Sequence, residues 1–226
     1  MTCYAEAGGG GEGRRMMERV VVTGMGALTP VGLTARETWD SLLAGRSGIG
    51  PISSFDASAL PVRIAGEVKG FEPRRYMDHK VARRMGRFAQ FAVACSVMAL
   101  EDAGLSVTEA NAERIPAVIN TGGGGAGWSA TARRSSWRSA APARSARCTL
   151  PLMAPNMVAC QPSIVLGLRG PVVSAVAACA AGVQAFAEAA HILRRGEADV
   201  LLTGGAESGI VSVPLARSPN ASPGDP

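Results

Sequence analysis

Aromatic residues and histidines are scarce in this chain of 226 residues: aromatic residues make up 4% of it, and its two histidines are His79 and His191. The five cysteines include no CxxC pair and no metal-ligand spacing with a histidine; they are Cys3, Cys95, Cys148, Cys160 and Cys179. An odd, scattered set of this kind is typical of reduced thiols in the cytoplasm. We therefore expect neither a disulfide nor a bound metal, and we assign no cofactor.

Long apolar runs are also missing from the sequence. No stretch reaches the roughly 18 residues of a membrane span, so we expect no membrane partner. The first 16 residues are rich in glycine and lack the apolar segment of a secretory signal. We interpret residues 1–16 as a disordered leader, with Met17 as the expected start of the chain.

The net charge of +5 is confined to one region. Five arginines and no acidic residue fall within residues 128–148, and the rest of the chain has 18 basic and 18 acidic residues, which does not favour nucleic-acid binding. Residues 128–148 have no apolar period, and residues 213–226 carry four prolines. We interpret both stretches as products of out-of-frame translation. Residues 128–148 are then an aberrant segment, and residues 213–226 a disordered tail.

Strands and helices are predicted to alternate along the chain. A valine run predicts a strand over residues 19–23, and the capping box Thr34-x-x-Glu37 opens a helix to about residue 44. Apolar spacing predicts a helix over 80–103 and another over 156–166, despite Pro162. Further strands are expected at 115–120, 172–177 and 199–203, with a weaker one at 63–68. A further helix is expected at 180–195, and loops are expected at 47–61 and 121–127. This order predicts an α/β fold with a mostly parallel sheet.

Cys179 lies where the predicted strand 172–177 meets the predicted helix 180–195, between small residues. The entrance of a helix carries unpaired N–H groups and a partial positive charge, which favour the thiolate, the reactive form of cysteine. Small neighbours allow a substrate and a second backbone segment to approach the sulfur. The pattern predicts a nucleophile at Cys179. The alternative is that a free cysteine is a small buried apolar residue, which is its more frequent role, and we keep this interpretation for the other four cysteines.

Four stretches together resemble the β-ketoacyl-acyl-carrier-protein synthases, the condensing enzymes of fatty acid and polyketide synthesis. They are residues 19–32 (RVVVTGMGALTPVG), 82–90 (ARRMGRFAQ), 172–182 (VVSAVAACAAG) and 196–207 (GEADVLLTGGAE). The subtype is closest to the type II elongating enzymes. The resemblance implies a thiolase-like layered α-β-α fold, mostly its N-terminal half, with the synthase N-terminal domain over residues 17–212.

The resemblance also implies a reaction and its partners. An acyl group is transferred to Cys179, and malonyl-carrier protein then loses carbon dioxide and attacks the acyl-Cys179 thioester. The partner is an acyl carrier protein bearing phosphopantetheine thioesters, and the family forms homodimers. Its condensation histidines and lysine come from a C-terminal half that this chain does not include. The alternative is a catalytically dead truncated fragment or a non-catalytic partner subunit, although such subunits lack the cysteine that is present here.

Other candidate sites have simpler explanations. Residues 122–127 match GxGxxG, but no helix and acidic residue follow as a dinucleotide site requires, so we expect a glycine turn near the active-site wall. His191 is twelve residues after Cys179, about 18 Å along a helix, too far to be its base, and we expect it to be partly buried. His79 is expected to be solvated, and Glu207 to be structural rather than an acid or base.

Six basic residues form a group within residues 74–87: Arg74, Arg75, Lys80, Arg83, Arg84 and Arg87. This basic group is either a solvated face or a contact surface for the carrier protein.

Overall fold

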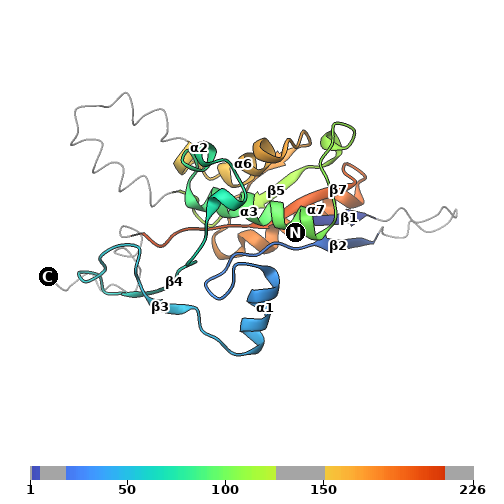
Figure 1. The fold of residues 1–226 in the computed structure, drawn as a ribbon. Coiled ribbons are helices and arrows are strands. Elements are labelled where there is room, and N and C mark those ends of the chain that lie inside the picture. The colour runs from blue at the N-terminus through green and yellow to red at the C-terminus, as the bar shows by residue number, and fades with distance from the viewer. Residues whose placement is uncertain (1, 6–18, 126–150, 212–226) are drawn as a thin grey trace, which may run out of the picture.

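The computed structural model describes residues 2–5, 19–125 and 151–211 and is drawn as a ribbon in Figure 1. Its strands are β1 (Thr2–Ala5), β2 (Val20–Gly24), β3 (Ile49–Pro51), β4 (Ile64–Gly66), β5 (Ala117–Asn120), β6 (Val172–Val173) and β7 (Val200–Gly205). Its α-helices are α1 (Ala35–Leu43), α2 (His79–Ala82), α3 (Arg87–Asp102), α6 (Met157–Leu166) and α7 (Ala181–Arg194), and 3-10 turns cover Pro73–Arg75, Ala112–Arg114 and Ala178–Ala180.

The main sheet has five strands in the order β2-β1-β7-β5-β6, and β3 and β4 form a separate antiparallel pair. β5 runs parallel to β6 and to β7, as the alternation of strands and helices predicted. β1 is antiparallel to both of its neighbours, β2 and β7, and is therefore an interior strand of the sheet. The expectation of disorder over residues 1–16 is therefore wrong for Thr2–Ala5, because these residues form ladder hydrogen bonds on both sides.

Helices cover both faces of the main sheet, as Figure 1 shows. Consecutive residues of a strand face opposite sides. Val118 and Leu201 accordingly pack with α7, while Ile119 of β5 packs with Phe88 of α3 and Val158 of α6. Fully burying a side chain of this size stabilises the fold by about 1.5–3 kcal/mol. The result is the layered α-β-α arrangement predicted from the sequence.

The predicted helix over residues 80–103 is two helices. α2 ends at Ala82, and α3 begins at Arg87 after Gly86, which has an extended backbone with φ −63° and ψ 151°. A Cβ on Gly86 would lie 2.6 Å from the carbonyl oxygen of Leu152. The close contact with Leu152 therefore requires glycine at this position. The extended backbone of Gly86 divides the helix that apolar spacing predicted as continuous over residues 80–103.

Other predicted elements are confirmed with small changes. Thr34 caps α1 by accepting from the Glu37 amide at 3.0 Å, and the Glu37 carboxylate accepts from the Leu33 amide at 2.8 Å. Pro162 is accommodated in α6, which ends at Gly167 in the left-handed conformation. β3 lies in the stretch 47–61, which was expected to be loop. It was not predicted because it is defined by its pairing with β4, which the local sequence does not indicate. The segments 128–148 and 213–226 lie outside the described residues, and no helix within the described part is long and apolar enough to cross a membrane.

Candidate active site

The segment around Cys179 forms the predicted strand, turn and helix. β6 is shorter than expected, but Val176 forms one further bridge to Thr121 beside it. The 3-10 turn Ala178–Ala180 then leads directly into α7. Ala178 has a φ of 45°, a left-handed conformation that a residue with a Cβ adopts at a cost of about 1–2 kcal/mol. The backbone is thus strained at the residue that precedes the thiol.

Cys179 is exposed and lines a cavity of about 490 Å³. The cavity lies at the carboxyl ends of β5 and β7, beside the first turn of α7. Its lining consists of Asn120, Thr121, Gly122, Ala178, Cys179, Ala181, Gly182, Gly205, Ala206 and Glu207. An accessible thiol at the entrance of a helix, beside a cavity with few bulky side chains, is suited to nucleophilic attack on an acyl group.

A buried amide holds the turn in place. The Oδ1 atom of Asn120 accepts from the Ala175 amide at 2.8 Å, and its Nδ2 atom donates to the Ala181 carbonyl at 3.1 Å. Asn120 is 2% exposed, and its backbone carbonyl accepts from the Ala206 amide. One residue of β5 therefore fixes both sides of the turn that carries Cys179. Asn120 was not among the predicted site residues, because its only sequence signal is that of a polar residue at the end of an apolar strand.

Small residues allow the segments to approach closely, as predicted. A Cβ on Gly205 would lie 3.0 Å from the Cα atom of Gly182, so α7 contacts the end of β7 through backbone alone. Gly124, with a φ of 63°, lies where a Cβ would come within 2.8 Å of Pro155. Gly122, in the glycine stretch expected to form a turn near the active site, lines the same cavity as Cys179. Gly127, the last residue of this motif, lies outside the described residues.

The other cysteines differ from Cys179 in their surroundings. Cys95 lies in α3, and burial raises the pKa of its thiol to about 11, so that it stays protonated at neutral pH. Cys160 is half-buried and accepts from the Asn156 amide at 3.8 Å. Nothing is described for the side chain of Cys3, and Cys148 lies outside the described residues. Among the cysteines described with their side chains, Cys179 alone is exposed.

Neither histidine of the chain lines the Cys179 cavity. His79 is exposed in α2, as expected. His191 lies in α7 and is exposed rather than partly buried, because it points away from the face that packs on the sheet. Within the ranges that the structure describes, no cluster of three or more His, Cys, Asp or Glu could hold a metal.

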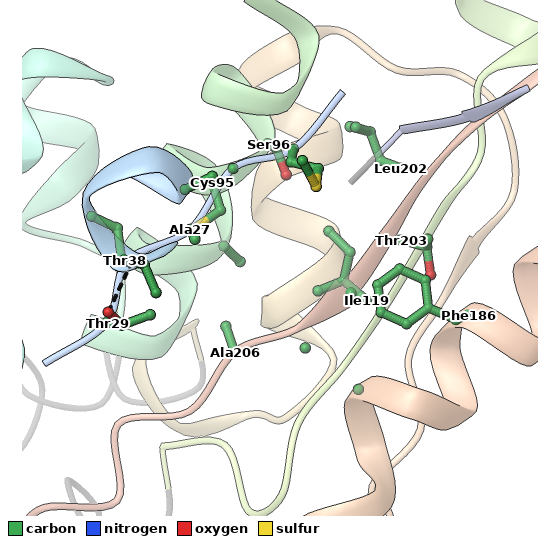
Figure 2. A pocket seen from close by; sticks show the side chains of 18 of the residues that line it. Ala27, Thr29, Thr38, Cys95, Ser96, Ile119, Phe186, Leu202, Thr203 and Ala206 are labelled. Carbon is green, nitrogen blue, oxygen red and sulfur yellow. Dashed lines mark hydrogen bonds between the residues drawn. The ribbon is translucent and has the colours of Figure 1, made fainter. Parts of the chain in front are cut away.

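A second cavity, of about 550 Å³, adjoins the first at Gly182, Gly205 and Ala206. Figure 2 shows its side chains converging from α1, α3, β5, β7, α7 and the segment after β2. They are mostly apolar, and a hydrogen bond of 3.0 Å joins the hydroxyls of Thr29 and Thr38 at one end. The two cavities therefore share a wall of small residues, and the second cavity extends the space beside Cys179 with a mostly apolar lining.

The basic group lies on the surface of the 3-10 turn Pro73–Arg75, of α2 and of the start of α3. All six of its side chains are exposed. Arg87 donates to the Val68 carbonyl at 2.8 Å and lies over the ring of Phe91, and Arg75 pairs with Glu72 at 3.2 Å. No ion pair occurs within the described residues for the other four, Arg74, Lys80, Arg83 and Arg84, which leaves a positive face available to an acidic surface.

Comparisons with known proteins agree with this geometry. The family described as "Beta-ketoacyl synthase, N-terminal domain" matches residues 17–220. The chain is 41% identical over 199 residues to 3-oxoacyl-[acyl-carrier-protein] synthase 2 of Synechocystis and 43% identical over 200 residues to that of Vibrio cholerae. Each match covers 88% of this chain and 48% of the relative, so the chain spans about half the length of these relatives.

Solved structures give the same result. A β-ketoacyl synthase from Burkholderia phymatum superposes with a TM-score of 0.75 at 30% identity, covering 88% of this chain and 48% of the other. The ishigamide ketosynthase/chain length factor superposes with a TM-score of 0.76 at 29% identity, covering 87% and 49%.

Proposed function

Because this chain belongs to the β-ketoacyl synthase family, matching its N-terminal domain, we propose that it carries the nucleophile half of a β-ketoacyl-acyl-carrier-protein synthase. The proposed activity is acyl transfer from a thioester to Cys179, the first step of a condensing enzyme of fatty acid or polyketide synthesis. The observation that carries the proposal is the position of Cys179: exposed, at the entrance of α7, and facing a cavity of about 490 Å³.

The acyl-transfer step is a thiol exchange. The Cys179 thiolate attacks the carbonyl carbon of the thioester, and a new C–S bond forms. The carrier's phosphopantetheine sulfur then leaves as a thiolate and takes up a proton from solvent. Backbone N–H groups of the turn at the start of α7 would stabilise the oxyanion that forms in between, and Asn120 keeps that turn in place.

The condensation step needs more than this cavity supplies. It requires loss of carbon dioxide from a malonyl thioester and attack of the resulting carbanion on acyl-Cys179. Hydrogen-bond donors must therefore stabilise the charge on the malonyl thioester oxygen. Neither His79 nor His191 lines the cavity, so we infer that this chain by itself accepts an acyl group without completing condensation.

We infer that the acyl donor is an acyl carrier protein. The curated relatives are named for this carrier, and carrier proteins are acidic. The face formed by Arg74, Lys80, Arg83 and Arg84 is exposed and positive, which suits such a partner. We propose homodimer formation and a cytoplasmic location on the family resemblance and on the scattered cysteines.

Release of thiol from a defined thioester tests the proposal. An acyl-pantetheine is mixed with the full chain, and released pantetheine is quantified by chromatography. We expect a burst of about one equivalent per chain, because the acyl-enzyme accumulates when no second substrate is present. The matched control, Cys160→Ala, should give the same burst, and Cys179→Ala none. A full burst from Cys179→Ala would contradict the proposed nucleophile.

A further inference from the structure

The carboxylate of Glu207 joins the two loops that leave β5 and β7. Its Oε2 atom accepts from the Gly123 amide at 2.7 Å and from the Thr121 hydroxyl at 3.2 Å. Its Oε1 atom accepts from the Ser208 amide at 2.7 Å. Thr121 and Glu207 are 86 residues apart in the sequence, so this contact ties together two distant segments at one edge of the sheet.

The segment that Glu207 holds is the glycine turn beside Cys179. The hydroxyl of Thr121 also accepts from the Gly124 amide at 3.1 Å, so the turn is fixed at both of its ends. Between them, a Cβ on Gly122 would lie 3.1 Å from Oε2 of Glu207 and 3.5 Å from the carbonyl oxygen of Ala178. The backbone of Gly122 is thus confined between Glu207 and the residue that precedes Cys179.

The contacts of Glu207 require a carboxylate. No ion pair to it occurs within the described ranges, and its donors are two backbone amides and one hydroxyl. Both oxygens therefore act as acceptors. A glutamine would present one oxygen and one NH₂ group, and the NH₂ group would face an N–H donor. The isosteric substitution therefore breaks the set of contacts while preserving its shape.

We propose that Glu207 is a positioning residue that holds the Thr121–Gly124 turn as the wall of the Cys179 cavity and thereby limits the size of the electrophile that reaches the thiol. The proposal rests on the proposed function in one respect: the electrophile whose size is limited is taken to be an acyl thioester. Glu207 touches no reacting atom in this account. It acts through the backbone of Gly122 and Gly123.

The test compares a small and a bulky reagent at the same thiol. Iodoacetamide and N-phenylmaleimide are reacted separately with the full chain, and the rate at Cys179 is followed by peptide mass spectrometry. In Glu207→Gln we expect the ratio of the bulky to the small rate to rise about fivefold, because the turn loses part of the contacts that hold it and opens more often to the bulky reagent. A residue that only stabilises the fold would change both rates by the same factor.

Two further variants keep the test decisive. Glu197→Gln removes an exposed carboxylate that pairs with Arg195, beyond the far end of α7, and should leave the ratio unchanged. Thr121→Val removes the hydroxyl that donates to Glu207 and accepts from the Gly124 amide, and should also raise the ratio, by about twofold or more. It replaces Glu207→Gln as the deciding variant if the latter does not fold. A ratio equal to that of Glu197→Gln would overturn the proposal.

Failure of the proposed function is distinguishable from failure of this inference. Thiol release from acyl-pantetheine by the unsubstituted chain tests acyl transfer alone. If that release is absent, the proposed function fails, and the reagent ratio still decides whether Glu207 shapes access to Cys179. If release is normal and the ratio is unchanged in Glu207→Gln, the positioning role alone is overturned.

Discussion

The side-chain amide of Asn120 donates to the carbonyl oxygen of Ala181 at 3.1 Å, in the first turn of the helix that follows Cys179. The same amide accepts from Ala175 on the other side of the turn. A buried polar side chain at the end of β5 therefore fixes the turn that carries Cys179, 59 residues away in sequence.

Replacing Asn120 by alanine should destabilise the protein and slow alkylation of Cys179. The substitution leaves the half-buried Ala175 amide without its acceptor, at a cost of about 1–3 kcal/mol, and removes the contact to the Ala181 carbonyl. Urea unfolding and the rate of iodoacetamide labelling measure the two effects. Asn111→Ala, which removes contacts in the turn before Ala112–Arg114, is the control and should leave the labelling rate unchanged. Equal labelling rates in both variants would contradict the role of Asn120.

Ala178→Gly should stabilise the protein by up to about 1 kcal/mol, because glycine adopts a positive φ without the Cβ penalty and this gain exceeds its larger entropy in the unfolded chain. Ala187→Gly, at an exposed position within α7, should have the opposite sign, costing about 1 kcal/mol. Urea unfolding of both variants measures the difference. If both variants lose the same stability, Ala178 does not hold the strained conformation described here.

Glu67 should make stability depend on pH in acid. Hydrogen bonds from Ser54 and Ser53 lower the pKa of Glu67 from 4.5 to about 2. A depressed pKa in the folded state contributes stability above pH 4.5, and this contribution is lost as the pH falls toward 2. The unfolding free energy of the unsubstituted chain should therefore fall more steeply between pH 4.5 and 2 than that of Glu67→Gln.

Glu72→Gln is the control for this acid limb, because Glu72 is exposed and pairs with Arg75 at the surface. Its pH dependence should follow that of the unsubstituted chain. Parallel curves for Glu67→Gln and the unsubstituted chain would show that Glu67 is not the group that titrates.

The N-terminal strand β1 offers a test of the sheet order. Tyr4 lies in β1 between β2 and β7, so proline there removes a ladder donor from an interior strand. Tyr4→Pro should lower the unfolding free energy by about 1–3 kcal/mol, the cost of leaving one ladder acceptor without its donor. The control Glu109→Pro lies at the second position of the exposed turn from Thr108 to Asn111, where proline is tolerated, and should have a much smaller effect. Equal stability of the two variants would contradict the interior position of β1.

Local sequence signals predicted the elements that local interactions determine. The Thr34 capping box, the glycine that ends α6 and the turn before α7 were predicted because each depends on residues within a few positions. The order of strands and helices then indicated a layered α/β fold. The same reasoning selected Cys179, because a helix entrance is recognisable from the residues on either side of it.

Long-range contacts were not predictable in the same way. β1 is held by pairing with segments that are distant in sequence, and its four residues have no alternation of their own. The break at Gly86 depends on the approach of Leu152, far along the chain. The roles of Asn120 and Glu207 likewise depend on partners more than 50 residues away. These features follow from tertiary packing, which the periodicity of one segment does not contain.

The identity of the acylated residue tests the central claim most directly. The full chain is mixed with an acyl-pantetheine at pH 7.5, quenched in acid and digested, and the acyl group is located by tandem mass spectrometry. We expect it on Cys179, because this thiol is exposed at the entrance of α7. Cys95 should remain free, since its pKa of about 11 leaves it protonated. An acyl group found on Cys95 or Cys160 in preference to Cys179 would contradict the assignment of the nucleophile.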